Sequence, residues 1–290
     1  MSEAADPART IAFQGLHGAY SHLACVEAYP EMRPLPCDSF EETFEAVEDG
    51  RAAYAMIPIE NSLAGRVGDI HHLMPDSGLH IVAEHFQRVV HHLLAPPGAK
   101  LKGLKTVHSH IHALSQCRRL IADLGLKAVV HADTAGAAAE VAARNDPSES
   151  AIAAELAAEI YALDVLRSGI EDAEHNTTRF MVMASEPIDP DPASGPVMTT
   201  FVFRVRNVPA ALYKVLGGFA TNGVNMVKLE SYMLDGTFTA TQFYADIEGH
   251  PSEERVRLAL EELGFFSRHV SVLGVYPAHP YRYQGPGGAD

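Results

Sequence analysis

The residues best suited to chemistry lie in one short stretch, where polar side chains lead directly into an apolar segment. The stretch reads Glu174-His175-Asn176-Thr177-Thr178-Arg179-Phe180, and Met181-Val182-Met183-Ala184 follow. The apolar part predicts a buried strand, and ligands collect at strand ends in open α/β sheets. Thr178 offers a hydroxyl that can pass a proton, and Arg179 beside it offers a planar fork of donors. This pair suits a substrate that carries a carboxylate and must lose a hydroxyl, although a strand-capping turn beside a surface arginine explains the same residues.

A second polar group follows another apolar run, 53–59, which predicts a short strand. Glu60, Asn61 and Ser62 place a carboxylate, an amide and a hydroxyl consecutively at its end, within the sequence Pro58-Ile59-Glu60-Asn61-Ser62. Such a group can orient a polar ligand. The alternative is that Ser62 caps a helix over the following apolar residues, and both interpretations can hold at once.

A third group has histidines at alternate positions, in Val107-His108-Ser109-His110-Ile111-His112. Ser109 has the position of a helix N-cap, which breaks the alternation where a third metal ligand is needed, so we expect no metal here. Ser109, His110 and Gln116 can instead line a ligand cleft at the start of that helix, whose N–H groups favour an anion. The pairs His71-His72 and His91-His92 each predict side chains on opposite sides of their element, at the surface or behind a site.

Composition excludes several classes of protein. The chain has 290 residues and a formal net charge of −15, which disfavours nucleic acid and anionic membranes as partners. No apolar run approaches the roughly 20 residues of a membrane span. The three cysteines show no paired spacing, and the first residues carry no secretion signal, so we expect a cytoplasmic protein. Neither a P-loop nor a GxGxxG fingerprint is present, so we expect no nucleotide cofactor.

Strands and helices alternate along the first part of the chain, which predicts a parallel-rich sheet with helices on both faces. The predicted strands include 10–14, 53–59, 105–108, 127–130 and 151–153, and the predicted helices include 39–50, 111–124 and 133–144. Alternation over 80–94 indicates one long strand or two. We expect a first domain over 8–186 with two lobes, one of about 8–84 plus 177–186 and one of about 85–176, and a cleft between them.

The pattern changes after a proline-rich linker, 187–197. The predicted strands and helices then follow the order βαββαβ over 198–278, with a hairpin about Asp235-Gly236 and a frayed tail after Pro280. This order is typical of a small ferredoxin-like domain.

Taken together, these motifs resemble prephenate dehydratase with a C-terminal ACT regulatory domain, and the resemblance covers nearly the whole chain. The segments that carry it are Gly15 to Ser21, Pro58 to Ser62 with Gly65 and Val67, Val107 to His110 with Gln116-Cys117, and Asn176 to Phe180. The resemblance implies an α/β fold with a two-lobed, type 2 periplasmic-binding-protein-like catalytic domain. It also implies conversion of prephenate to phenylpyruvate, with no cofactor, in phenylalanine biosynthesis.

The resemblance also assigns the site. We expect Thr178 to give a proton to the leaving hydroxyl, Arg179 to hold a carboxylate and Glu60 to orient Arg179. The expected substrate-binding residues are Asn61, Ser62, Ser109, His110, Gln116, Thr177 and Phe180. Arogenate, which carries an amine in place of the side-chain keto group, is an alternative substrate. A non-catalytic sensor of amino acids or carboxylates is the alternative from another functional class.

The resemblance further implies a phenylalanine site in the ACT domain. Its expected residues are Ala210, Ala211, Leu212, Asn225, Glu230 and Ser231. The family pattern usually reads Gly-Ala-Leu at the first of these positions and Glu-Ser-Arg-Pro after the second strand. Here Ala210 adds a methyl group, and Tyr232-Met233 replace the arginine and proline. Because ACT domains usually bury a sheet edge or helical face against another copy, we expect a homodimer or homotetramer.

Overall fold

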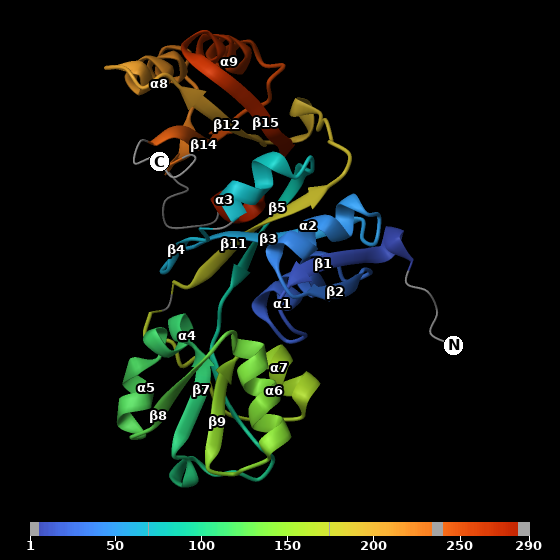
Figure 1. Cartoon of the computed structure of the whole chain (residues 1–290), viewed down its shortest axis with the longest axis vertical. Helices are drawn as coiled ribbons and strands as arrows, with labels where there is room; N and C mark the ends of the chain where they lie inside the picture. The colour runs from blue at the N-terminus through green and yellow to red at the C-terminus, as the bar shows by residue number, and fades with distance from the viewer. Residues whose placement is uncertain (1–5, 69, 174, 234–239, 284–290) are drawn as a thin grey trace. The chain divides into compact units, whose positions relative to one another are not determined.

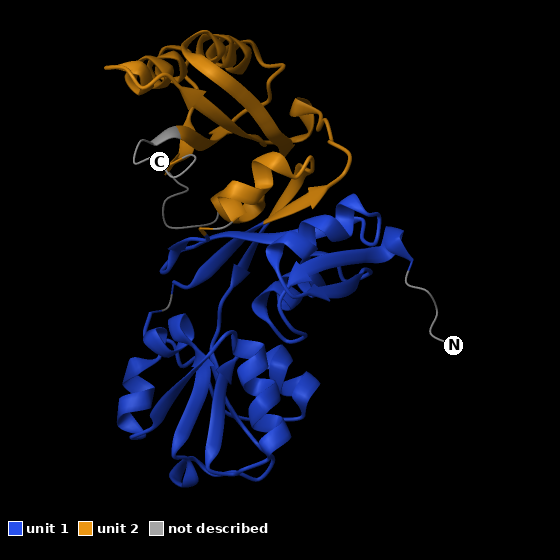
Figure 2. Cartoon of the chain, in the orientation of Figure 1, with its two compact units in different colours: residues 1–67, 85–180 blue, residues 68–84, 181–290 orange. Residues whose placement is uncertain are grey.

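The computed structural model describes the whole chain except residues 1–5, 69, 174, 234–239 and 284–290. It divides into two compact units, which Figure 2 shows in different colours. Unit 1 consists of residues 1–67 and 85–180, and unit 2 of residues 68–84 and 181–290. Two strands, β5 (His80–Arg88) and β11 (Thr177–Ala184), begin in one unit and end in the other.

The first lobe of unit 1 is built on parallel strands that are covered by two helices (Figure 1). Its central strand β1 (Thr10–Gln14) pairs in parallel with β2 (Arg33–Cys37) and with β3 (Tyr54–Asn61). The helices α1 (Tyr20–Ala28) and α2 (Phe40–Glu48) pack on these strands. The start of α2 is capped on both sides, because Ser39 Oγ accepts the N–H of Glu42 and the Glu42 carboxylate accepts the N–H of Asp38.

The second lobe of unit 1 is a five-stranded sheet in the order β10-β6-β9-β7-β8, with helices on both faces (Figure 1). Leu93 and Ala95 of β6 join the apolar cluster under one layer of helices, while Leu94 joins the cluster under the other, as strand alternation requires. The elements are β6 (His92–Ala95), β7 (Thr106–His110), α4 (Ile111–Gln116), α5 (Arg118–Asp123), β8 (Lys127–His131), α6 (Thr134–Arg144), β9 (Glu149–Ala153), α7 (Glu155–Tyr161) and β10 (Asp164–Ser168).

One sequence expectation about these elements needs correction, and one alternative is resolved. The helix predicted over 111–124 is broken into α4 and α5 at Cys117, whose backbone leaves the helical region. The alternation over 80–94, which indicated one long strand or two, corresponds to two strands, β5 and β6. The mixed α/β architecture with two lobes is confirmed, because the chain crosses from the first lobe to the second after β5 and returns at β11.

Unit 2 contains the predicted βαββαβ order. Its antiparallel strands follow the spatial order β13-β14-β12-β15, and α8 and α9 lie against one face of the sheet (Figure 1). The elements are β12 (Val197–Val205), α8 (Ala211–Thr221), β13 (Met226–Met233), β14 (Ala240–Glu248), α9 (Glu254–Phe266) and β15 (Ser267–Pro277). The hairpin expected about Asp235-Gly236 lies outside the described residues, as does most of the tail beyond the 3-10 turn Pro280–Tyr283.

Residues 68–84 also belong to unit 2, through contacts with this sheet and with the C-terminal turn. The ring of His71, in α3 (Ile70–Leu73), lies 4.8 Å from the ring of Tyr232 and 5.2 Å from that of Tyr244. The fully buried carboxylate of Glu84 accepts two hydrogen bonds from Arg282, at 2.6 and 2.8 Å. A segment that precedes the second lobe in sequence is therefore part of the C-terminal unit.

Candidate functional site

The end of β3 forms a turn that fixes the side chain of Asn61. Its Oδ1 accepts the N–H groups of Leu63 and Ala64 at 2.9 and 2.8 Å. The two-residue hairpin strand β4 (Gly65–Arg66) then pairs back on β3. Because the carbonyl oxygen of the amide is committed to this turn, the NH₂ group must point to the opposite side.

That NH₂ group faces Thr178. Asn61 Nδ2 donates to Thr178 Oγ1 at 3.0 Å and to Asn176 Oδ1 at 2.8 Å. The hydroxyl oxygen of Thr178 therefore accepts a hydrogen bond, while its own hydrogen is donated to none of the described residues. A hydroxyl in this state can give its proton to a bound molecule, and the amide then stabilises the charge that develops on the oxygen.

Arg179 follows Thr178 within strand β11, so the two side chains leave opposite faces of the strand. Their partners show the same separation, since Asn61 contacts Thr178 while Glu60 accepts from Arg179 Nη1 at 3.1 Å. The Arg179 side chain is buried and its guanidinium carbon lies 6.0 Å from the ring centre of Phe86. The expected role of Arg179, to hold a substrate carboxylate beside Thr178, stays a prediction. Glu60 does contact Arg179, as expected.

A chain of hydrogen bonds links Asn61 to the second lobe. Asn176 Nδ2 donates to Gln116 Oε1 at 2.9 Å, and the same oxygen lies 2.8 Å from His91 Nε2. Since an amide oxygen only accepts, His91 carries its proton on Nε2. The other ring nitrogen lies 2.8 Å from the hydroxyl of Tyr20, which also reaches the carbonyl oxygen of Val90.

Burial determines the charge state of this chain. Desolvation lowers the pKa of His91, and the hydrogen bond to Gln116 and the charge of Glu171 oppose that shift. Desolvation also raises the pKa of Tyr20, with smaller contributions from Cys117 and Glu171. The network is therefore electrically neutral at neutral pH. It connects the start of α1, the segment between β5 and β6, α4 and the turn after β3.

The remaining predicted residues lie in different surroundings. Ser62 Oγ donates to the carbonyl oxygen of His175 at 2.6 Å and accepts the N–H of Thr177, so it ties β3 to the approach of β11. It does not cap the helix that begins at Ile70, because its hydroxyl is committed elsewhere.

Ser109 and Phe180 are buried inside the protein. Ser109 is fully buried within β7 and donates to the carbonyl oxygen of Ile152 at 2.5 Å, so its only hydrogen is used between two strands. The N-cap of α4 is His110, whose Nδ1 accepts the N–H of His112, and this corrects the N-cap expected at Ser109. Phe180 is 1% exposed in the core. These positions leave neither Ser109 nor Phe180 able to touch a substrate.

The predicted effector residues all lie in unit 2, but their side chains have separate partners. Ala210 is the N-cap of α8 and has a φ of 64°, in the left-handed region that favours glycine. Asn225 Nδ2 donates to Glu248 at 3.0 Å, and Lys228 Nζ lies 3.4 Å from Glu230. The positive φ at Ala210 explains why the family pattern has a glycine at this position.

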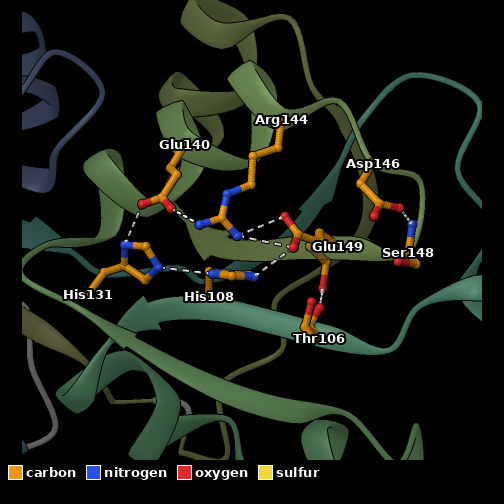
Figure 3. Close-up of polar contacts among 9 residues, drawn as sticks. Thr106, His108, His131, Glu140, Arg144, Asp146, Ser148 and Glu149 are labelled. Carbon is orange, nitrogen blue, oxygen red and sulfur yellow. Dashed lines mark hydrogen bonds and ion pairs between the residues drawn. The ribbon is translucent and has the colours of Figure 1, made fainter.

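Of the alternating histidines, His108 belongs to a separate polar cluster in the second lobe (Figure 3), whereas His110 and His112 lie together at the start of α4. His108 Nδ1 lies 2.9 Å from His131 Nε2, and the other nitrogen of His131 lies 3.2 Å from Glu140. Arg144 contacts both Glu140 and Glu149 and completes the cluster. Among the described residues there is no group of three or more side chains placed to hold a metal ion.

Sequence reasoning missed three members of the network: Tyr20, His91 and Asn176. Asn176 and Tyr20 lie within the motifs that carried the resemblance, so their presence there was the available signal. His91 was expected at the surface or behind a site; at 2% exposed it is not at the surface, and its contacts place it behind the Asn61–Thr178 pair. No local pattern reveals its contact with Gln116, because 25 residues separate the two in sequence.

Fold and site together define a two-lobed α/β protein with a small C-terminal βαββαβ domain and a neutral polar network that joins both lobes. The family model for prephenate dehydratase matches residues 11–188. The chain belongs to the prephenate dehydratase family and is a lyase, as the sequence predicted. Among the described residues, no helix is long and apolar enough to cross a membrane.

Relatives with known names match nearly the whole chain. A bifunctional N-acyl-homoserine lactone acylase/prephenate dehydratase from Komagataeibacter europaeus is 54% identical over 94% of this chain and 98% of its own. Arogenate dehydratase 3 of Arabidopsis thaliana is 40% identical over 92% of this chain and 66% of its own. The prephenate dehydratase of Arthrobacter aurescens in complex with L-Phe is 30% identical, covers 93% of this chain and 90% of its own, and has a TM-score of 0.84.

Proposed function

We propose that this protein converts prephenate to phenylpyruvate and that Thr178 is the proton donor. The observation that carries the proposal is the 3.0 Å hydrogen bond from Asn61 Nδ2 to Thr178 Oγ1. This bond makes the Thr178 oxygen an acceptor, so the hydrogen of the Thr178 hydroxyl points away from Asn61. The turn at Leu63 and Ala64 holds the amide in this orientation before substrate binds.

The reaction balances with this donor. The ring carboxylate leaves as CO₂, and the electron pair of the broken C–C bond enters the ring, which becomes aromatic. The ring hydroxyl takes the proton of Thr178 and leaves as water, and Thr178 recovers a proton from solvent. Because a threonine hydroxyl is a weak acid, proton transfer accompanies C–O cleavage, and the amide of Asn61 stabilises the oxygen while it loses its proton. A positioned proton donor contributes about 10²–10⁴-fold.

The surrounding residues position this pair. In the proposal Asn176 and Gln116 hold Asn61 from the second lobe, Glu60 orients Arg179, and Arg179 contributes positive charge from the opposite face of β11. Thr177, Ser62 and His110 remain proposed substrate neighbours. Ser109 and Phe180 are left out because their side chains are buried.

The test replaces Thr178 by serine and by alanine. Thr178→Ser keeps the hydroxyl and should retain most of the turnover, whereas Thr178→Ala should lose about 10²-fold or more in kcat. Phenylpyruvate formation is measured with prephenate and with arogenate as separate substrates. Near-normal turnover by the alanine variant contradicts the assignment, and a preference for arogenate makes that compound the substrate.

We further propose that phenylalanine modulates turnover at the C-terminal domain, here called the ACT domain, 198–278. The supporting observation is that a relative of 30% identity was solved with L-Phe. The proposed residues are Ala210, Ala211, Leu212, Asn225, Glu230 and Ser231. A flat response of turnover to added phenylalanine removes this claim. The homodimer or homotetramer and the cytoplasmic location also stay predictions, testable by light scattering and cell fractionation.

A second candidate activity is hydrolysis of an acyl amide, such as an N-acyl-homoserine lactone. The bifunctional relative suggests it, and a serine, histidine and aspartate in unit 2 provide suitable groups. His250 Nε2 lies 2.9 Å from Asp189, and Nδ1 lies 2.7 Å from Ser252 Oγ. Because Nδ1 also accepts the N–H of Ser252, the imidazole proton must be on Nε2, and the ring can act as base toward the serine hydroxyl.

The steps of this hydrolysis balance as follows. Ser252 Oγ attacks the acyl carbon while its proton passes to His250, which then protonates the leaving amine. Water finally releases the acyl group from the serine. Similar turns occur at His110 and His279, where Nδ1 accepts the N–H two residues on. What distinguishes His250 is the hydroxyl on one nitrogen together with the carboxylate on the other.

A fluorophosphonate probe, which labels activated serines, tests this candidate. We expect the label on Ser252, located by peptide mass spectrometry, with loss in Ser252→Ala and strong reduction in His250→Gln. The exposed Ser194 serves as the control position, and Ser194→Ala should leave labelling unchanged. Acyl-homoserine lactone hydrolysis that survives in Ser252→Ala contradicts the site. The absence of hydrolysis by the wild type contradicts the activity itself.

A further inference from the structure

Unit 1 contains a cavity of about 500 Å³ that shares no residue with the Asn61–Thr178 network. Its wall comes from three segments: α1 of the first lobe, the crossing segment 87–92 between β5 and β6, and the start of α7 in the second lobe. The two lobes touch beside it, since the Tyr161 hydroxyl donates to the carbonyl oxygen of His17 at 2.7 Å. A volume of this size lies within the range of about 300–1,000 Å³ that holds small ligands.

The cavity and the Asn61–Thr178 network lie on opposite sides of the crossing segment 87–92. Arg88, Val90 and His92 line it, while His91 takes part in the hydrogen bonds to Tyr20 and Gln116. Alternate residues of an extended chain point to opposite sides, which explains the division over 88–92, and the neighbouring Gln87 also lines the cavity. The predicted opposite orientation of His91 and His92 is thereby confirmed. A molecule in the cavity would contact the back of the segment that contributes His91 to the polar network.

The lining of the cavity carries more negatively than positively charged side chains. Glu27, Glu155 and Glu159 line it, and none of them forms an ion pair with the described residues. Glu155 and Glu159 are one turn apart on α7 and face the cavity together. Arg88 is the one cation of this lining, and it also has no carboxylate partner among the described residues. Leu23, Val26 and Leu156 supply apolar surface between these groups.

His92 gives an independent indication of a ligand. Its side chain is 7% exposed and lines the cavity, and its buried Nδ1 has no hydrogen-bond partner among the described residues. Leaving such a group unsatisfied costs about 1–3 kcal/mol. A polar molecule in the cavity can provide the missing partner.

We propose that this cavity binds a free amino acid with an apolar side chain and that the binding regulates turnover. The glutamates receive the ammonium group, Arg88 receives the carboxylate, and the apolar surface of α1 and α7 holds the side chain. This site is separate from the proposed phenylalanine site of the ACT domain. Only the effect on turnover rests on the proposed dehydratase function, because binding can be measured by itself.

The test uses L-leucine, L-methionine and L-phenylalanine as probes and isothermal titration calorimetry on the full chain. At least one should bind, whereas isoamylamine and 4-methylpentanoate, which carry only one of leucine's two charged groups, should bind at least about tenfold more weakly. The combined variant Glu155→Gln/Glu159→Gln and the variant Arg88→Gln should each weaken binding about tenfold or more. Glu45→Gln, at an exposed glutamate of α2, is the matched control and should bind as the wild type does.

The binding and turnover results together decide whether the cavity is an amino-acid site. Absence of binding by all three amino acids overturns the proposal, as does equal binding of the amine alone. Binding that survives the cavity variants but disappears in Asn225→Ala places the ligand in the ACT domain and also overturns it. Binding with the expected losses but unchanged turnover keeps the site and removes the regulation. If the wild type binds the probe yet makes no phenylpyruvate, the dehydratase proposal fails while the cavity proposal stands.

Discussion

Replacing Asn61 by aspartate tests the central hydrogen bond with almost no change in shape. The variant keeps the Oδ1 acceptor that holds Leu63 and Ala64 but replaces the NH₂ donor with a second acceptor oxygen. Thr178 then loses the donor at 3.0 Å, and its own hydroxyl turns toward the new carboxylate. Asn176 loses a donor at 2.8 Å as well.

The magnitude follows from what the lost donor does during the reaction. Removing one preorganised donor beside a developing oxyanion costs about 10²–10³-fold in kcat. The added negative charge also repels a substrate that carries two carboxylates, so KM should rise. Loss of two neutral hydrogen bonds should reduce the free energy of unfolding by about 1–3 kcal/mol in total.

The pH dependence of kcat distinguishes loss of this hydrogen-bond donor from partial unfolding of the variant. An aspartate titrates at an ordinary pKa near 3.9, and the protonated acid regains one O–H donor. As the pH falls from 7 toward 5, the protonated fraction grows about tenfold per unit. The ratio of variant to wild-type kcat should therefore rise as the pH falls.

The assay measures phenylpyruvate formation across this pH range. Asn145→Asp is the matched control, because it makes the same change in charge at an exposed position of the same unit. Wild-type kcat in Asn61→Asp, or a ratio that does not vary with pH while the protein stays folded, would refute the reasoning.

Three further predictions concern stability and use thermal or urea unfolding. Ala210→Gly should stabilise unit 2 by about 0.5–1 kcal/mol, because φ is 64° there; a loss of stability would contradict this. His22 is buried and its pKa is lowered to about 4, so its contribution is complete above about pH 6.5 and falls as the pH drops toward 4, by at most about 3 kcal/mol. His22→Gln should flatten that part of the pH–stability curve, and an unchanged slope would assign it elsewhere. Arg282→Ala should cost about 3–5 kcal/mol by removing the charged partner of the buried Glu84 carboxylate, which keeps the N–H of His279, whereas a loss below 1 kcal/mol would show that the ion pair is dispensable.

The element order was predictable because periodicity and capping residues are local. Strand β2 was missed because Pro34 and Pro36 argue against a strand, yet it lies at the edge of its sheet, where missing N–H groups are tolerated. The break at Cys117 was also missed, since the helical pattern of 111–124 continues through it. Local sequence does not show where tertiary packing interrupts a helix.

The candidate site was predictable only in part. Motif positions identified Asn61, Thr178 and Gln116, and the structure brings these into one network. The assignment of Ser109 as a substrate ligand came from its place before a helix, and sequence gave no sign that Ile152 takes its hydrogen. Such long-range partners depend on strand order, which no local pattern specifies.

The contacts of residues 68–84 limit how the protein can be divided. A fragment that begins at the linker would lack α3 and the start of β5, so the rings of Tyr232 and Tyr244 would lose His71 and Arg282 would lose Glu84. A regulatory fragment for isolated work must therefore include residues 68–84, joined by an engineered connection. For the same reason, exchanging C-terminal domains between relatives at the linker would mismatch this surface unless 68–84 were exchanged with them.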